Sequence, residues 1–280
     1  MLHPMTSVET KRATFRKLHE QGCFVIPNPW DRGSARYLAH LGFPALATSS
    51  AGYAFSQALP DEPTALPRDQ VLAHVREIAC AADVPVNADF QDGYARDIDA
   101  LKESVRLCVE AGAAGISIED ATGDPGQPFY PLDIAVARVR AARTAIDSTG
   151  CDVLLTARAE QNLIGHPDAL AESIRRLKAY AQAGAHVLYA PGLRGRDPMS
   201  AVIDAVAPRP VNILIGADVG LRVSDVAALG ARRISVGSAL ARVAWTAFMR
   251  AARMIATDGD FGAFADLAST RELSELFAVR

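Results

Sequence analysis

An excess charge of one sign, long apolar runs and clustered cysteine or histidine are all missing from this chain. Its 280 residues carry 29 Lys and Arg against 32 Asp and Glu, a net charge of −3, so no basic surface for nucleic acid is expected. No apolar stretch is long enough to span a bilayer, and the N-terminus has no secretory pattern, which argues against membrane insertion and secretion. The cysteines, Cys23, Cys80, Cys108 and Cys151, share no metal-ligand spacing. They are expected to be reduced, as in a cytoplasmic protein.

Short apolar runs recur along the chain at regular intervals. Apolar runs of four to six residues are typical of strands buried on both faces, as in a parallel sheet covered by helices. Several of the helical patterns between them end in glycine, at Gly42, Gly112, Gly184 and Gly230, where this residue can close the last helical turn. Eight strands are therefore expected, at 24–27, 45–50, 85–89, 115–120, 152–158, 186–191, 211–216 and 233–237.

Eight strand-helix units match the size of a (β/α)8 barrel, which takes roughly 250 residues. The sequence thus predicts an α/β chain folded as a TIM barrel, with a doubly wound open sheet as the alternative. Because no linker or low-complexity segment divides the chain, one domain over residues 1–280 is expected. Two extra helices are predicted at 238–257 and 262–277. The C-terminal helices, about 238–280, either pack on their own subunit or are swapped with a neighbour in a homo-oligomer.

Polar groups follow several of these runs at the point where the strand is expected to end. Asp89, Glu119 and Arg158 end three of them, and the hydroxyl of Ser50 ends another. Carboxyl ends of parallel strands meet at one rim, where barrel enzymes hold their active sites. Acidic oxygen ligands, which Asp61 would join, suit a hard cation such as Mg²⁺, with Mn²⁺ as a second candidate. Arg158 offers a forked donor for the carboxylate of a small-molecule substrate.

Four strings with the same order and spacing resemble the isocitrate lyase and phosphoenolpyruvate mutase superfamily. They are Ala47-Thr-Ser-Ser-Ala-Gly52, Asn87-Ala-Asp-Phe-Gln-Asp-Gly-Tyr94, Gly115-Ile-Ser-Ile-Glu-Asp120 and Leu155-Thr-Ala-Arg-Ala-Glu160. The resemblance runs from about Phe24 to about Arg250. It implies a (β/α)8 barrel, usually assembled as a tetramer with a swapped C-terminal helix, that acts on small 2-oxo or 2-hydroxy carboxylates with Mg²⁺. A homo-oligomer, dimer or tetramer, is expected.

The resemblance also implies roles for individual residues. Asp89 takes the place of the carboxylate that binds the metal directly, while Glu119 and Asp61 match partners that bind it through water. Arg158 matches the arginine that neutralises developing negative charge. The segment that would hold the 2-oxo acid end of the substrate is Ser50, Ala51 and Gly52.

Three places depart from the superfamily pattern. Gln91 stands where many relatives have a second carboxylate, and its amide is expected to hydrogen-bond a metal-bound water. The segment 121–130 is short and lacks the cysteine and histidine of the isocitrate lyase lid. Tyr189, expected to contact substrate, stands where phosphonopyruvate enzymes have a histidine near the end of the sixth strand. Isocitrate lyase activity and P–C chemistry are therefore both disfavoured.

The chemistry that remains is cleavage of a C–C bond through an enolate stabilised by a metal. We expect a Mg-dependent lyase acting on an oxaloacetate-, alkylmalate- or methylisocitrate-like dicarboxylate, with Glu160, Tyr189 or a metal hydroxide as the base. The alternatives are a phosphonopyruvate or phosphoenolpyruvate P–C enzyme and a non-catalytic 2-oxo acid binder. The segment 236–238 resembles a phosphate cradle, but an N-cap role for Ser238 is the preferred interpretation.

Overall fold

Eight parallel strands form one sheet in the computed structural model, which describes residues 6–62 and 65–278. All eight strands expected from the sequence are present, and their order around the sheet is β1-β8-β7-β6-β5-β4-β3-β2. The predicted TIM barrel is thereby confirmed. The strands are β1 (Phe24–Ile26), β2 (Leu46–Ala47), β3 (Val86–Asp89), β4 (Gly115–Glu119), β5 (Leu154–Arg158), β6 (Val187–Tyr189), β7 (Val211–Leu214) and β8 (Arg233–Ser235).

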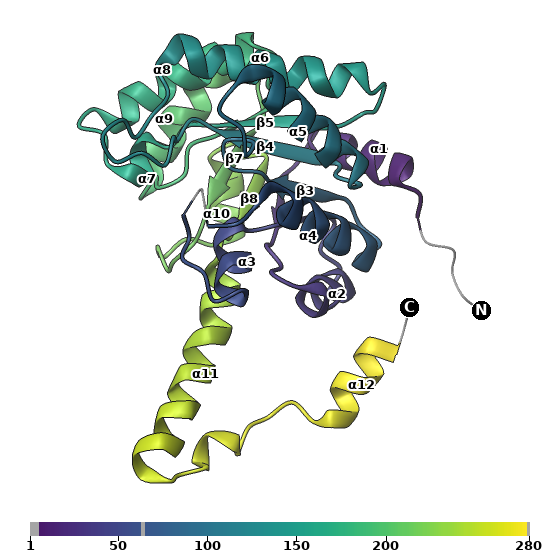
Figure 1. Cartoon of the computed structure of the whole chain (residues 1–280). Coiled ribbons are helices and arrows are strands. Elements are labelled where there is room, and N and C mark those ends of the chain that lie inside the picture. Colours follow the sequence, from purple (N-terminus) through teal and green to yellow (C-terminus); the bar gives the residue numbers. More distant parts are fainter. Residues whose placement is uncertain (1–5, 63–64, 279–280) are drawn as a thin grey trace.

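Helices cover the outside of this sheet (Figure 1). Most of them are amphipathic and turn their apolar side toward the strands, which buries a continuous shell of Ala, Val, Leu and Ile. The helices of the barrel are α1 (Val8–Leu18), α2 (Arg32–His40), α3 (Ser50–Ser56), α4 (Arg68–Ala81), α5 (Ile98–Glu110), α6 (Leu132–Ser148), α7 (Gln161–Ile164), α8 (Ala169–Gln182), α9 (Arg196–Val206) and α10 (Val223–Ala228).

Between β1 and β2 the barrel is closed by individual hydrogen bonds rather than by a regular strand pairing. The backbone N–H of Ala47 donates to the carbonyl of Pro27 at 3.0 Å. Beside it, the side-chain amide of Asn28 donates to the carbonyl of Thr48 at 2.9 Å. Strand β2 is short because Ser50 already begins α3, so the strand predicted over 45–50 ends early, at Ala47.

Helix α1 closes the barrel at the end where the strands begin. Phe15 is completely buried among Phe24, Ile26 and Leu154, which lie on β1 and β5. Gly115, the first residue of β4, leaves room for this ring, because a Cβ there would come within 2.6 Å of Phe15 Cε1. The amino ends of the strands are therefore plugged, and solvent reaches the barrel interior from the opposite end.

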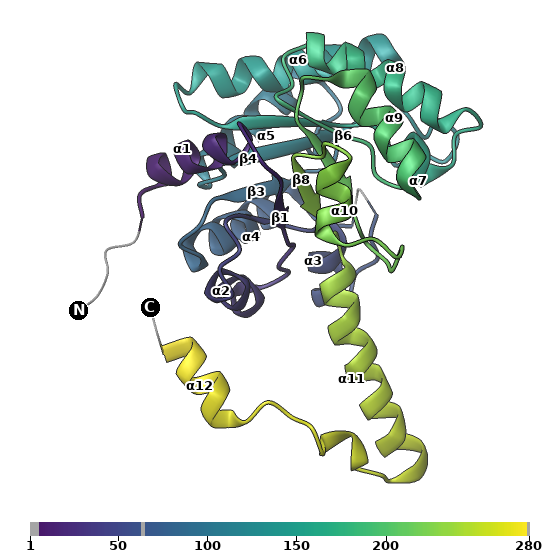
Figure 2. The same cartoon turned by 180° about the vertical axis from the view of Figure 1, so that it is seen from behind.

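The C-terminal segment leaves the barrel (Figures 1 and 2). Helix α11 (Ala239–Asp258) confirms the first extra helix, but the second, predicted over 262–277, is wrong in its extent. Residues Gly262–Phe264 form one 3-10 turn, and α12 covers only Thr270–Ala278. The helix begins there because Ser269 Oγ accepts a hydrogen bond from the N–H of Glu272.

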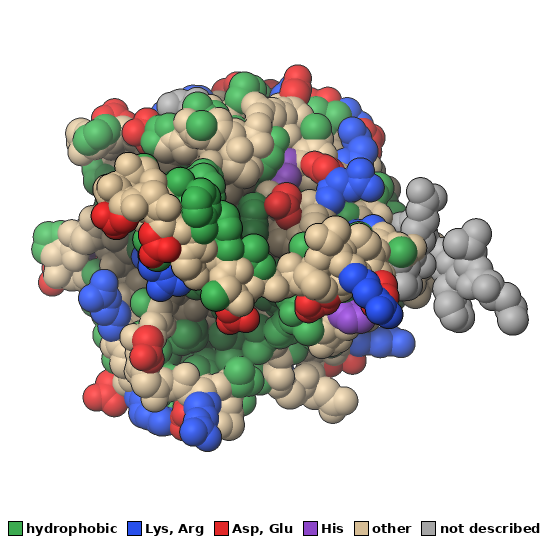
Figure 3. Space-filling view, turned by 90° about the horizontal axis from the view of Figure 1, so that it is seen from below, with side chains coloured by type: hydrophobic (Ala, Val, Ile, Leu, Met, Phe, Trp, Pro, Cys, Tyr) green, Lys and Arg blue, Asp and Glu red, His purple; other side chains and the backbone are tan. Residues whose placement is uncertain are grey.

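Helix α11 and the segment that follows it expose large apolar side chains. Val243, Phe248, Phe261 and Leu267 are each more than 60% exposed. Figure 3 views this side of the molecule and shows apolar side chains gathered in a hollow between polar rims. In the described residues, no helix combines the length and the apolar character that a bilayer crossing needs. The division into one domain and the exchange of the C-terminal helices both stay predictions.

Candidate active site

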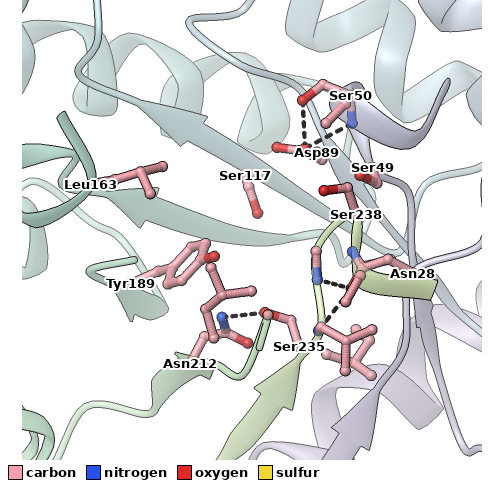
Figure 4. Close-up of a pocket in the computed structure, with 18 of the residues that line it drawn as sticks. Asn28, Ser49, Ser50, Asp89, Ser117, Leu163, Tyr189, Asn212, Ser235 and Ser238 are labelled. Atoms are coloured by element: carbon pink, nitrogen blue, oxygen red, sulfur yellow. Dashed lines mark hydrogen bonds between the residues drawn. The ribbon is translucent and has the colours of Figure 1, made fainter. Parts of the chain in front are cut away.

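A cavity of about 410 Å³ opens at the carboxyl ends of the strands. Its walls come from the ends of most strands and from the loops that follow them, as expected for the catalytic face of a (β/α)8 barrel. Figure 4 shows Ser50 and Asp89 on one wall and Tyr189 and Asn212 on the other. Of the predicted site residues, those that line it are Ser50, Ala51, Asp61, Asp89, Arg158 and Tyr189.

Asp89 ends β3 and is held by the segment that follows β2. Its Oδ2 accepts hydrogen bonds from the N–H and from the hydroxyl of Ser50, both at 3.0 Å. The backbone N–H of Asp89 donates to Thr48 Oγ1 at 2.9 Å. These contacts fix the carboxylate at the cavity wall (Figure 4). Gly52 does not line the cavity: its N–H donates to Ser49 Oγ, which caps α3, and its missing Cβ leaves space for Trp30.

Arg158 ends β5 and joins three carboxylates. Its Nη1 lies 3.2 Å from Asp89 Oδ1 and 3.2 Å from Glu119 Oε2. Its Nε and Nη2 donate to the carboxylate of Glu160, a forked pairing. Burial opposes the charge of this guanidinium, but Glu160 and Glu119 outweigh it, and the pKa of Arg158 is raised well above its ordinary value.

The carboxylates around Arg158 outnumber its single charge. Burial, and then the charges of Glu160 and Asp89, raise the pKa of Glu119 well above the ordinary value, although Arg158 acts in the opposite direction. Burial also raises the pKa of Glu160. Asp61 lies exposed at the rim, where partial desolvation and then the charge of Asp89 raise its pKa. The carboxylates of the site therefore resist full ionisation, and a bound cation would favour their charged forms.

A second hollow adjoins the first beneath segment 121–130. Ser50, Asp61 and Arg158 line both, and Gln91 and Glu119 line the second hollow. All the residues predicted as metal ligands, Asp89, Glu119, Asp61 and Gln91, therefore lie around this junction. The structure brings them together from β3, β4 and the loop after α3.

Segment 121–130 is a compact hairpin-like loop. Ala121 and Phe129 form an antiparallel bridge, and the N–H of Thr122 donates to the carbonyl of Pro128 at 3.0 Å. Asp124 Oδ1 accepts from the N–H of Gly126 at 2.8 Å. The loop borders the second hollow with Gly123, Asp124, Pro125 and Pro128. It is held by its own hydrogen bonds beside the acidic cluster.

The segment after β8 differs from both interpretations of its sequence. The N–H groups of Val236 and Gly237 donate to Asn28 Oδ1 at 3.0 and 2.9 Å, so they are not free for a phosphate (Figure 4). Ser238 occupies the N-cap position of α11, but its side chain makes no capping hydrogen bond. Asn28, which no sequence motif singles out, thus ties β8 to β1.

A buried network behind Glu160 also escaped the sequence interpretation. The carboxylate of Asp120 accepts hydrogen bonds from the backbone N–H of Glu160 at 2.9 Å, from Arg176 Nη1 at 3.0 Å and from the Tyr180 hydroxyl at 2.6 Å. Gln161 Nε2 donates to the same carboxylate at 3.1 Å. Asp120 anchors the turn from which Glu160 reaches Arg158. The only sequence signal was its place next to Glu119.

The fold is a (β/α)8 barrel, and several carboxylates surround Arg158 at the carboxyl ends of its strands. This arrangement is typical of a barrel enzyme. A sequence model of phosphoenolpyruvate phosphomutase matches residues 15–256, and the chain belongs to this family. The resemblance found in the sequence motifs is confirmed, and with it the assignment to the lyases and mutases of the isocitrate lyase and phosphoenolpyruvate mutase superfamily.

Three similar proteins illustrate the range of the family. The chain is 30% identical over 239 residues to oxaloacetate decarboxylase of Paraburkholderia xenovorans, covering 82% of this chain and 76% of that protein. A Burkholderia cenocepacia protein provisionally assigned as a lyase/mutase is 45% identical, with a TM-score of 0.93 and 97% coverage of each chain. The structure of 2,3-dimethylmalate lyase matches with a TM-score of 0.82 and 26% identity, covering 99% of this chain and 95% of the other.

Proposed function

We propose that the protein is a Mg²⁺-dependent lyase that cleaves a C–C bond of a small 2-oxo or 2-hydroxy dicarboxylate. The observation that carries the proposal is the cluster of Asp61, Asp89, Glu119 and Glu160 around the single guanidinium of Arg158. The oxaloacetate decarboxylase and 2,3-dimethylmalate lyase relatives act on acids of this kind, as their names state. Family membership and site chemistry thus support the same reaction class.

The donor set fits a hydrated hard cation. In the described residues, no three Asp, Glu, His or Cys side chains are grouped closely enough to coordinate one ion directly. Mg²⁺ keeps several of its waters and needs only one or two carboxylates. Asp89 would bind it directly, while Glu119, Asp61 and Gln91 would hold its waters. Mn²⁺ takes the same oxygen ligands.

The side chains of the site would act on the substrate around this ion. A bound divalent cation supplies positive charge that stabilises the enolate left by C–C cleavage. Arg158 would donate to a substrate carboxylate, and Glu160 holds the guanidinium in place for this contact. Ser50 would position the 2-oxo acid end beside Asp89. Burial raises the pKa of Tyr189 to about 12, so its phenol stays a neutral donor at neutral pH.

Calorimetric titration with oxalate, which mimics the enolate, tests the proposal. Oxalate should bind in the presence of Mg²⁺ and not in its absence, and Asp89→Asn should abolish the metal-dependent binding. Asp99→Asn, on the exposed side of α5, is the matched control and should bind like the wild type. Binding that does not depend on the metal, or that survives Asp89→Asn in a folded protein, would contradict the proposal.

A turnover screen with Mg²⁺ separates the substrate classes. Oxaloacetate, methylisocitrate and alkylmalates represent C–C cleavage, and phosphonopyruvate represents P–C chemistry. We expect turnover among the dicarboxylates. Turnover of phosphonopyruvate alone would favour the P–C alternative, and ligand binding without turnover of any of them would favour the non-catalytic binder.

We also propose that the C-terminal segment packs on another copy of this chain. Phe248, Phe261 and Phe264 lie exposed on or next to α11, and Leu267 lies exposed between the 3-10 turn and α12. A row of exposed aromatic and aliphatic side chains of this size is costly in water and is typical of an interface. Exchange of α11 and α12 between subunits would bury it in a homodimer or homotetramer.

A further inference from the structure

The barrel interior beneath the cavity is polar. Barrels of this class are usually filled there by Val, Ile and Leu. In this protein the inner layers contain polar side chains that are at most 7% exposed, namely Asn87, Ser117, Thr156, Asn212, Arg233 and Ser235. All of these except Thr156 line the inner end of the cavity. The Phe15 plug lies on their other side. Buried polar groups need hydrogen-bond partners. Because Phe15 closes one side of this layer, a further partner such as a ligand can reach it from the cavity.

Arg233, on β8, is the charged member of this layer and is 3% exposed. Its Nε donates to Asn212 Oδ1 at 2.9 Å, its Nη2 to Thr156 Oγ1 at 3.1 Å and its Nη1 to Asn87 Oδ1 at 3.5 Å. All three acceptors are neutral, and no ion pair joins Arg233 to a carboxylate of the described chain. Burial lowers its pKa to about 10, so the guanidinium is still charged at neutral pH. A buried cation without a counter-ion is costly.

Two hydrogen-bond relays lead from Arg233 to the cavity. Because the guanidinium donates to the oxygen of each amide, both amide NH₂ groups point away from it. Asn212 Nδ2 donates to Ser235 Oγ at 2.9 Å, and Asn87 Nδ2 donates to Ser117 Oγ at 3.0 Å. Each serine oxygen thus accepts from behind. The Ser117 hydroxyl keeps its own hydrogen as a donor, and the Ser235 hydroxyl hydrogen-bonds with the Tyr189 phenol, a contact that a bound carboxylate would replace. Ser117 and the phenol of Tyr189 point into the same space (Figure 4), and Ser235 lies beside that phenol.

We propose that the inner end of the cavity is a subsite for a second carboxylate of the substrate, bound by the hydroxyls of Ser117 and Ser235 with Arg233 as the counter-charge behind them. The inference rests on the proposed function, since the first carboxylate would lie at Asp89 and Arg158. Hydrogen bonds in a chain polarise one another, so a cation at one end strengthens the donors at the other. Arg194 and Arg242 also line the cavity but are exposed at its rim, where water screens them.

Malate and lactate provide a matched pair of ligands. Both are 2-hydroxy carboxylates, and only malate has a second carboxylate. In calorimetry with Mg²⁺, Ser117→Ala and Ser235→Ala should each weaken malate binding about tenfold or more, since each removes a hydrogen bond to a charged group. Lactate affinity should stay within about twofold. Asn212→Asp, which places a carboxylate against Arg233, should have the same selective effect on malate.

Thr156→Val is the control. It removes one acceptor of Arg233 but leaves both relays intact, so both affinities should stay within about twofold of the wild type. Equal weakening of malate and lactate by the serine variants, or no weakening of either, would overturn the subsite. If a variant that lacks Arg194 and Arg242 selectively loses malate binding while the serine variants do not, the second carboxylate binds at the rim and the subsite is wrong.

A measurement on the metal-free protein tests the carboxylate subsite independently of the proposed lyase function. Acetate should raise the thermal midpoint of the metal-free wild type more than chloride at equal ionic strength, because binding to the folded state alone stabilises it. The difference should disappear in the variant that carries both Ser117→Ala and Ser235→Ala. If acetate has no such effect on the wild type, the subsite is wrong. If acetate stabilises but oxalate shows no dependence on Mg²⁺, the proposed lyase function is wrong and the anion site remains.

Discussion

Replacement of Asp120 by Asn should destabilise the protein strongly although the two side chains have the same shape. Among the residues that the structure describes, Asp120 Oδ2 accepts from Gln161, Arg176 and Tyr180, whereas Oδ1 accepts only from the N–H of Glu160. The amide oxygen of the variant would therefore take the Oδ2 position. Its NH₂ would then face the Glu160 N–H, which loses its partner inside the protein.

The size of the expected stability loss follows from the buried charge of Arg176, which loses its carboxylate partner in the variant. The side chains of Asp120 and Arg176 are 2% and 8% exposed, and breaking such a buried pair costs about 3–5 kcal/mol. Glu172 also pairs with Arg176, at 2.7 Å, so we expect a loss near 3 kcal/mol, at the lower end of that range. At a urea m-value of about 3 kcal/mol/M, the unfolding midpoint would fall by about 1 M.

Urea unfolding followed by circular dichroism provides the assay, with Tyr180→Phe as the matched control. That variant removes one neutral donor to the same charged carboxylate and should cost about 1.5 kcal/mol. In a double-mutant cycle, Asp120→Asn should cost much less in a protein that already carries Arg176→Met. A loss below that of Tyr180→Phe, or two full additive losses in the cycle, would show that the Asp120–Arg176 pair is not what stabilises this region.

Further predictions concern metal binding, stability and assembly. Because Glu119 and Asp61 have raised pKa values, binding of Mg²⁺ should displace protons from them. Calorimetry in buffers of different ionisation enthalpy should show proton release that grows as the pH is lowered. A binding heat that does not depend on the buffer would contradict this. In the metal-free protein these groups hold protons more tightly than in the unfolded chain, so the unfolding free energy should fall as the pH rises from about 4 through their raised pKa values. Phe15→Ala should cost about 3–5 kcal/mol in urea unfolding, because the ring is fully buried under the barrel. Phe248→Asp should shift the sedimentation profile toward smaller species, whereas Thr257→Asp, at an exposed polar position of the same helix, should not.

The strands and the residues at their ends could be predicted from the sequence for a simple reason. A strand buried on both faces must be apolar, so a charge such as Asp89 or Arg158 at its end is conspicuous. Three features were hidden because they depend on which partner a polar group finds in space. Ser50 looks like a strand end but begins a helix, Asn28 takes the N–H groups of the segment after β8, and Arg233 is one residue among many arginines until the barrel closes around it.

The loop at 121–130, which is held by its own hydrogen bonds, would affect how an enolate formed in this barrel is protonated. This ten-residue hairpin is fixed by its own backbone contacts, and Asp61, which borders the same hollow, is exposed, so bulk water would remain within reach of an enolate formed at this site. Quenching by a solvent proton would then outpace return of the departing fragment. With an alkylmalate substrate, turnover in deuterium oxide should place the isotope at the newly protonated carbon in both configurations, the mark of an intermediate that is protonated from either face.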